Sequence, residues 1–300
     1  MSKRSLALLA AIGATTIYGI NHTLAKGVMP IYIKPFGFIF LRVTGAAILF
    51  WGISLFGPKE KIEMRDWGRL GVAALLGMVI NMLSFFKGLE LSTPINSAVL
   101  ITISPIVVVI LSAILLKERI TRNKGLGILL GFVGALALIL FGAELRGDAP
   151  NIPLGNSLFI VNSFAYAGYL IVAKKLVAKY HPFTLMKWLF TIAVIINFPV
   201  TINEFLEIQW AIMPLWAYGV LAFVVIGTTF LTYLFNIFAM TELKASTIGA
   251  FIYVQPLFGI LFALVTGKDT LTTIKILAAS LVLLGVYLAS KRQKPGPQSE

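Results

Sequence analysis

Two stretches of this chain decide its fold: ITISPIVVVILSAILLKERITRNKGLGILLGFVG at residues 101–134 and IYVQPLFGILFALVTGKDTLTTIKILAASLVLLG at residues 252–285. They align without a gap over 34 positions, at an offset of 151, and share about eight identities. A proline (Pro105 and Pro256), a basic–acidic step and a glycine fall in the same register. The match predicts an internal duplication, which is a common plan among membrane transporters.

The composition places most of the chain in lipid or in a protein interior. Of its 300 residues, 58% are hydrophobic and 12% are charged, whereas soluble domains have about 25% charged residues. The net charge of +13 does not indicate nucleic-acid binding, because we expect no soluble domain that could carry a basic and aromatic binding surface. Cysteine is absent, which excludes disulfides and thiol chemistry.

Ten segments are long and apolar enough to cross a bilayer as helices, which takes about 20 residues each. We predict an all-α integral membrane protein with ten transmembrane helices, at residues 5–25, 35–56, 68–86, 93–116, 123–142, 154–173, 183–203, 212–239, 244–266 and 270–290.

Basic residues predict the orientation. With a cytoplasmic N-terminus, 17 of the 25 Lys and Arg residues fall on the inner side and 6 on the outer side. Cytoplasmic loops carry the excess of Lys and Arg. We therefore expect both termini in the cytoplasm of a multi-pass protein of the bacterial inner membrane.

The two copies must have opposite orientations, because five helices per copy is an odd number. We predict two inverted five-helix repeats, residues 1–146 and residues 147–300, the second with a short cytoplasmic tail. The loops differ accordingly: Arg119 and Arg122, on the inside, correspond to Thr270 and Thr273, on the outside.

The sequence resembles the EamA-type ten-helix transporters of the drug/metabolite transporter superfamily over roughly residues 6–290. The residues that carry the resemblance are Tyr18-Gly19-Ile20-Asn21, Lys26, Pro35, Arg42, Ser104-Pro105, Leu116-Lys117-Glu118-Arg119-Ile120-Thr121, Gly127, Gly131 and Gly134. The second copy departs from the pattern, since Leu189 stands where a counterpart of Arg42 is expected. The resemblance implies transport of small molecules, often export of amino acids or other metabolites, with each half resembling one EamA unit.

Paired irregularities point to a central site. Pro105 and Pro256 occupy equivalent depths in the fourth and ninth segments, and Ser104 and Gln255 precede them. Helix breaks paired across two halves mark substrate sites in transporters. The alternative is that the prolines only bend their helices.

Polar and aromatic side chains at helical spacing predict the walls of a pathway, since unsatisfied polar groups are costly at lipid depth. In the first segment Tyr18, Asn21 and His22 share one face. The alternative is ordinary packing. The complete set of candidate pathway residues is Tyr18, Asn21, His22, Arg42, Asn81, Asn96, Ser104, Pro105, Tyr166, Tyr169, Tyr233, Asn236, Tyr253, Gln255 and Pro256.

Arg42 is the charged residue placed deepest in a predicted span, about eight residues from its start. Buried charges in membranes mark functional sites. Arg42 can bind a substrate carboxylate, a backbone carbonyl or Glu90. None of the 12 acidic residues falls in the middle third of a span, which favours facilitated diffusion or exchange. If protons are coupled, His22 is the first candidate, and its alternative is a packing histidine.

These observations predict an exporter or exchanger of a small metabolite, an amino acid or related zwitterionic or anionic solute, working by alternating access around a midplane cavity. The alternatives are a proton-coupled multidrug efflux carrier and an intramembrane enzyme. We predict no catalytic residue, metal site or cofactor, because Cys is absent and His22 and His181 are far apart in the chain. The expected partners are the substrate and the lipid bilayer, with no nucleic acid. Small residues in the fifth and tenth segments favour a scaffold or a homodimer contact.

Overall fold

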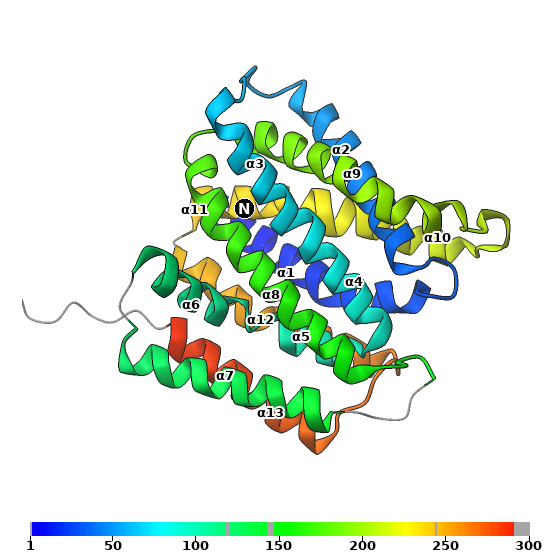
Figure 1. Ribbon diagram of the computed structural model, residues 1–300, viewed down its shortest axis with the longest axis vertical. Coiled ribbons are helices and arrows are strands. Elements are labelled where there is room, and N and C mark those ends of the chain that lie inside the picture. Colours follow the sequence, from blue (N-terminus) through cyan, green and yellow to red (C-terminus); the bar gives the residue numbers. More distant parts are fainter. Residues whose placement is uncertain (1, 118–119, 143–146, 244, 291–300) are drawn as a thin grey trace, which may run out of the picture.

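A computed structural model describes residues 2–117, 120–142, 147–243 and 245–290, and these form helices and no strand (Figure 1). Seven of the described helical stretches are long and apolar enough to cross a membrane. The elements are α1 (Lys3–Val28), α2 (Pro35–Ser54), η1 (Met64–Asp66), α3 (Trp67–Ala74), η2 (Leu75–Ile80), α4 (Asn81–Leu91), α5 (Pro94–Ile101), α6 (Ser104–Leu116), α7 (Arg122–Phe141), α8 (Ile152–Val177), α9 (Pro182–Leu206), η3 (Trp210–Ile212), α10 (Leu215–Ala222), η4 (Phe223–Leu231), α11 (Thr232–Glu242), α12 (Ala245–Val265) and α13 (Thr273–Ser290).

The helices pack mostly against partners distant in sequence. α7 lies along α13 at one edge of the molecule, and α2 lies along α9 toward the other side (Figure 1). Between these pairs, α1 packs on α11 and α12, while α8 packs on α4 and α6. The core is therefore built from contacts between residues 1–142 and residues 147–290.

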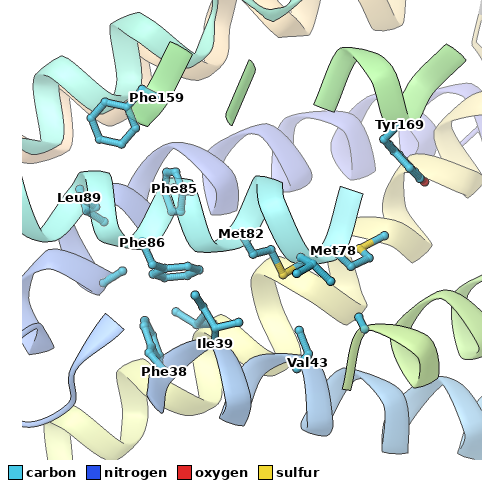
Figure 2. Packing of buried hydrophobic residues seen from close by; sticks show 14 of the residues in the cluster. Phe38, Ile39, Val43, Met78, Met82, Phe85, Phe86, Leu89, Phe159 and Tyr169 are labelled. Atoms are coloured by element: carbon cyan, nitrogen blue, oxygen red, sulfur yellow. The ribbon is translucent and has the colours of Figure 1, made fainter. Parts of the chain in front are cut away.

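Fully buried phenylalanines fill the space between α2 and α4. The ring centroids of Phe38 of α2 and Phe86 of α4 lie 5.0 Å apart and the rings meet edge to face, and Phe86 meets its neighbour on α4, Phe85, in the same way. Figure 2 shows Phe38 and Phe86 facing each other with Ile39 and Met82 beside them, and Phe85 on the other side of α4. Edge-to-face pairs add about 1 kcal/mol each to the burial of apolar area, so this packing fixes the position of α2 against α4.

Two π-helices, η2 and η4, interrupt the third and eighth predicted segments. A π-helix widens the turn and displaces backbone hydrogen bonds. Side chains take up carbonyls in both places: Asn197 Nδ2 donates to Met78 O at 3.4 Å, and Thr228 Oγ1 donates to Val224 O at 2.6 Å. Each widened turn is thus satisfied by a local or neighbouring polar group, as an apolar environment requires.

The contact between α7 and α13, which we call the glycine seam, brings two backbones together. A Cβ built on Gly127 would lie 2.5 Å from the Gly285 carbonyl oxygen, and one built on Gly285 would lie 2.6 Å from the Gly127 carbonyl oxygen. Small residues permit this approach. The small residues of the fifth and tenth segments therefore pack on each other within one chain, as scaffold.

Acidic side chains cap helix N-termini at both ends of the α2–α9 pair. Glu204 Oε2 accepts from the backbone N–H of Phe36 at 2.7 Å, at the start of α2. Glu60 Oε2 accepts from the His181 N–H at 2.8 Å, at the start of α9. Carboxylates are stabilising at helix N-termini, where N–H groups lack partners. We call these two ends of the molecule the Glu204 end and the Glu60 end.

A buried ion pair closes the loop between α12 and α13. Lys275 Nζ lies 2.9 Å from Asp269 Oδ1, and both side chains have no exposed surface. Asp269 Oδ2 also accepts from the Ile95 N–H at 2.9 Å, in the first turn of α5. The sequence places these charges in an outer loop, but burial ties them to the start of another helix. Glu118, the residue that corresponds to Asp269 in the first copy, lies outside the described residues.

Candidate functional site

Arg42 projects from α2 into the middle of the helix bundle. Its Nε donates to Thr229 Oγ1 at 2.9 Å, and its guanidinium carbon lies 5.5 Å from the centre of the Phe86 ring. Thr229 can accept because its own hydroxyl donates to Val224 O at 3.1 Å. The third partner that the sequence suggested, Glu90, instead pairs with Lys87. Arg42 has no carboxylate partner within the described part of the chain.

Two tyrosines lie near this guanidinium, and two more lie near one of them. Tyr18 of α1 and Tyr233 of α11 lie close enough to Arg42 to interact electrostatically with it. Tyr166 and Tyr169 of α8 interact in the same way with Tyr18, and their ring centroids are 6.1 Å apart. We call these five residues the Arg–Tyr cluster. Three predicted spans besides that of Arg42 thus contribute to one polar and aromatic centre.

Most side chains of the Arg–Tyr cluster keep accessible surface. Tyr166 keeps 41% of its surface exposed. Tyr18, Arg42 and Tyr233 are half-buried. Tyr169, by contrast, is buried and packs on Gly77, where a Cβ would lie 2.6 Å from the ring. The cluster therefore has one packed wall, made by Tyr169, and an accessible side.

Asn21 and His22 follow one turn after Tyr18 on α1, and both are buried. His22 Nδ1 lies 2.8 Å from Ser97 Oγ, and that hydroxyl donates to Pro94 O at 2.9 Å. The Ser97 oxygen therefore accepts, which makes Nδ1 the protonated nitrogen of His22. Asn21 Oδ1 is buried and has no hydrogen-bond partner among the described residues.

Three further candidate pathway residues, Asn81, Asn96 and Ser104, have polar partners on α8. Asn81 Nδ2 donates to Asn162 O at 3.2 Å, and Asn162 Nδ2 donates back to Asn81 O at 2.8 Å. Asn96 Nδ2 donates to Asn156 Oδ1 at 3.3 Å, and Ser104 Oγ donates to Ser163 Oγ at 3.1 Å. These bonds join α4, α5 and α6 to α8, so the three side chains serve helix contacts in this structure.

The two prolines occupy different structures. Pro105 stands in the first turn of α6, directly after the break at Thr102–Ile103 that separates α5 from α6. Pro256 lies inside the continuous α12. The carbonyl of Gln255, the preceding residue, would lie 2.9 Å from a Cβ on Gly19, so α1 and α12 touch here. Asn236 is half-buried on α11, and the side chain of Tyr253 lies outside the described part of the structure.

Two buried asparagines were missed by the sequence interpretation. Asn156 and Asn197 have no exposed surface. Asn156 joins α8 to α7 by donating to Leu138 O at 2.9 Å, and Asn197 supports the π-helix η2. Each is a polar residue within an apolar predicted segment, and this pattern is their signal in the sequence.

An exposed ionic network covers the Glu60 end. Lys179 Nζ lies 2.6 Å from Glu63 Oε1 and 2.7 Å from Asp66 Oδ2. The hydrogen bond from Lys179 holds the pKa of the Glu63 carboxyl below its ordinary value. The same network raises the pKa of Lys179, with the bond to Asp66 as the largest cause. These charges link the loop before α3 to the loop before α9.

Comparisons with known proteins give the chain a family. The model of the EamA-like transporter family matches residues 5–140 and again residues 153–291. A transporter of unknown role from Archaeoglobus fulgidus is 26% identical over 93% of this chain and 96% of its own. The transporter YyaM of Bacillus subtilis is 26% identical over 74% of this chain and 71% of its own.

A solved crystal structure shares the fold. It superposes with a TM-score of 0.60 over 95% of this chain and 96% of the other chain, at 19% sequence identity. The apolar helices, the two matches to one family model and the named relatives agree with an integral, multi-pass membrane protein. This chain belongs to the EamA-like transporter family, within the drug/metabolite transporter superfamily.

Proposed function

We propose that this protein carries a small metabolite with a carboxylate group, an amino acid or a related zwitterionic or anionic solute, across the membrane as an exporter or exchanger. Transport rather than catalysis is its role. The observation that carries the proposal is the guanidinium of Arg42, deep in the bundle, half-exposed and without a carboxylate partner among the described residues. An unpaired charge at such depth is costly, and substrate sites are where membrane proteins keep one.

The Arg–Tyr cluster would hold the substrate from two sides. Arg42 offers N–H groups to the carboxylate, and the planar guanidinium suits a bidentate contact. Tyr18 and Tyr166 provide hydroxyl groups and ring faces. Asn21 Oδ1, buried and lacking a donor among the described residues, would accept from a substrate amino group. The cluster holds no acidic residue, which disfavours a bulky organic cation.

The framework for this site is two inverted five-helix repeats, residues 1–146 and residues 147–300, with ten spans. Support comes from the family model, which matches the chain twice. It also comes from the packing, since α1 contacts α11 and α12 of the second repeat, and its counterpart α8 contacts α4 and α6 of the first. The π-helices η2 and η4 fall at corresponding places.

Alternating access would open the two ends in turn around the Arg–Tyr cluster. We place both termini in the cytoplasm of a bacterial inner membrane, so that the Glu60 end faces the cytoplasm and the Glu204 end faces outside. The contacts between Lys34 and Glu207 at one end, and between Lys179 and Glu63 at the other, are exposed ion pairs. Such pairs contribute at most about 1 kcal/mol, so they can break and re-form during a transport cycle.

The test begins with a thermal-shift screen of the purified protein against amino acids, nucleosides and organic acids. A solute that stabilises it is then followed into liposomes that contain the wild type, Arg42→Ala or Asn21→Ala. We expect saturable flux of a carboxylate-bearing solute that Arg42→Ala abolishes. Arg69→Ala, which removes an exposed arginine, should leave flux unchanged.

Two results would count against the proposal. One is the absence of flux for every solute, with both variants silent in the binding screen. The other is strong uptake of cationic dyes that Arg42→Ala blocks, which would favour a multidrug carrier.

A further inference from the structure

An apolar groove runs along the outside of the α2–α9 pair, away from the Arg–Tyr cluster. Its volume is about 410 Å³. The walls include exposed apolar side chains, with Ile48 at 67% and Ile195 at 66% exposure. From Thr44 to Trp51 the groove follows two turns of α2, a rise of about 10 Å. The lining residues include Thr44, Ala47, Ile48, Trp51, Thr191 and Ile195.

The floor of the groove is fixed by a hydrogen bond between the two helices. The indole N–H of Trp51 donates to Thr191 Oγ1 at 2.9 Å, and Thr191 Oγ1 donates to the Lys187 carbonyl at 2.6 Å. The Trp51 ring is therefore held in one orientation, and its face is presented to the next turn of α9. The groove is a preformed surface and not an accident of one flexible side chain.

A cation stands at the end of this groove. Lys187 Nζ lies 4.8 Å from the centre of the Trp51 ring and 6.0 Å from that of Trp188. Cation–π contacts position an ammonium but leave its N–H groups free to donate. Within the described residues Lys187 has no carboxylate partner. It is the charged group at the mouth of an otherwise apolar groove.

We propose that this groove binds one anionic phospholipid, with an acyl chain along α2 and α9 and the phosphate at Lys187. Lys187 is five residues from the start of α9 and Trp51 three from the end of α2, which is where headgroups meet acyl chains. Tryptophan and lysine are the side chains that anchor proteins at that level, and basic pockets between helices bind anionic headgroups.

The groove does not suit a second protein chain. A stable protein interface buries about 1,200–2,000 Å² in total, and this groove is lined by seven residues of two neighbouring helices. Its chemistry, a long apolar strip that ends at one cation, matches a fatty-acyl chain with a negative group at its end.

Native mass spectrometry of the intact protein, released from nanodiscs of equal parts phosphatidylglycerol and phosphatidylcholine with matched chains, tests this assignment. We expect one retained phosphatidylglycerol per chain. Lys187→Gln should lower its retention about fivefold, the factor for about 1 kcal/mol per lysine near a membrane surface. Lys175→Gln removes a positive charge from an exposed position on α8 and should change nothing.

A second variant separates loss of the site from loss of the fold. Ile195→Trp fills the groove from an exposed position and should exclude either lipid while the melting temperature of delipidated protein stays the same. Equal retention of the two lipids by the wild type would overturn the proposal. So would equal losses in Lys187→Gln and Lys175→Gln, or a dimer that Ile195→Trp dissociates.

Discussion

The glycine seam and the Arg–Tyr cluster differ in how tightly the helices are packed. In the seam, α7 and α13 touch backbone to backbone, and an added Cβ on Gly127 would meet the Gly285 carbonyl at 2.5 Å. In the cluster, large side chains from α1, α2, α8 and α11 keep accessible surface, as Tyr166 does at 41%. The seam has no space for a side chain or a ligand, whereas the cluster keeps surface that a ligand can contact.

This difference shows where the molecule is rigid and where it can receive a ligand. Close packing of small residues has only one arrangement, so the seam can serve as a fixed frame. The cluster combines an unpaired cation with tyrosine hydroxyls, and these groups gain partners when a solute enters. Changes in the seam should therefore act on folding, and changes in the cluster should act on transport.

The largest expected effect is on the seam. Gly127→Leu forces a side chain into the backbone of α13 and should destabilise the protein by about 3 kcal/mol or more, at the upper end for overpacking. Thermal unfolding in detergent measures this. Gly125→Leu, two residues away on the same helix, meets only a side-chain atom at 4.0 Å and should be tolerated. Equal melting temperatures for the two variants would contradict the conclusion that the seam is a tightly packed frame.

The next effect belongs to the cluster. Arg42→Gln keeps a polar side chain but removes the charge, and charge-assisted hydrogen bonds contribute about 1.5–3 kcal/mol. Solute flux in liposomes should fall about tenfold to a hundredfold, while the melting temperature without solute does not fall. If Arg42→Gln unfolds at a lower temperature and still transports, Arg42 stabilises the fold and does not bind the solute.

A smaller effect decides the place of Asn81, which the sequence assigned to the pathway. Asn81→Ala removes its bond to the Asn162 carbonyl, and loss of one such hydrogen bond costs about 1 kcal/mol. Chemical denaturation should detect that loss, with flux nearly unchanged. Asn236→Ala, at a half-buried position on α11, is the matched control and should not lower stability. Reduced flux with unchanged stability in Asn81→Ala would instead show that Asn81 lines the substrate pathway.

The smallest effect concerns the ionic network at the Glu60 end, which lies outside both regions. Because the pKa of Glu63 is lowered in the folded protein, the pair with Lys179 stabilises above the ordinary carboxyl value of about 4.3 and is lost as pH falls below it. The raised pKa of Lys179 acts in the other direction. Its contribution is complete below about pH 10.4 and is lost as pH rises further.

Melting temperatures between pH 3 and pH 7 measure the acid side. Lys179→Met should flatten the loss of stability as pH falls, and Lys175→Met, an exposed control, should not. An unchanged acid slope in Lys179→Met would assign the effect to other carboxylates.

The positions of the helices could be read from the sequence because hydrophobic length is a direct consequence of bilayer thickness. The first predicted span, residues 5–25, is α1 from Lys3 to Val28. The break between α5 and α6 falls just before Pro105, the residue that signalled it. The π-helices could not be predicted, since hydropathy carries no information on which backbone N–H meets which carbonyl.

The sequence predicted the types of residue in the candidate site, but it did not predict their hydrogen-bond partners. Polarity at lipid depth selected Arg42 and Tyr166, and the same signal selected Asn96, which bonds to Asn156. A single sequence shows that a buried polar group needs a partner and leaves open whether that partner is the protein or a solute. Lys275 shows the opposite error, because this lysine, which was counted among the basic residues of the outer side, is fully buried on Asp269.

The π-helices have a consequence for the length of the chain. An α-helix turns about 100° per residue, so each widened turn holds one residue more than a regular helix needs. Deleting a single residue from Leu75–Ile80 would therefore let the segment close into a continuous α-helix, while Asn81 and Phe86, which lie beyond it, keep the helix faces that they now occupy. One deletion in Phe223–Leu231 would act likewise on Tyr233. Spacing along these two segments is thus set by an inserted residue, and homologous chains should be aligned there with a one-residue gap allowed.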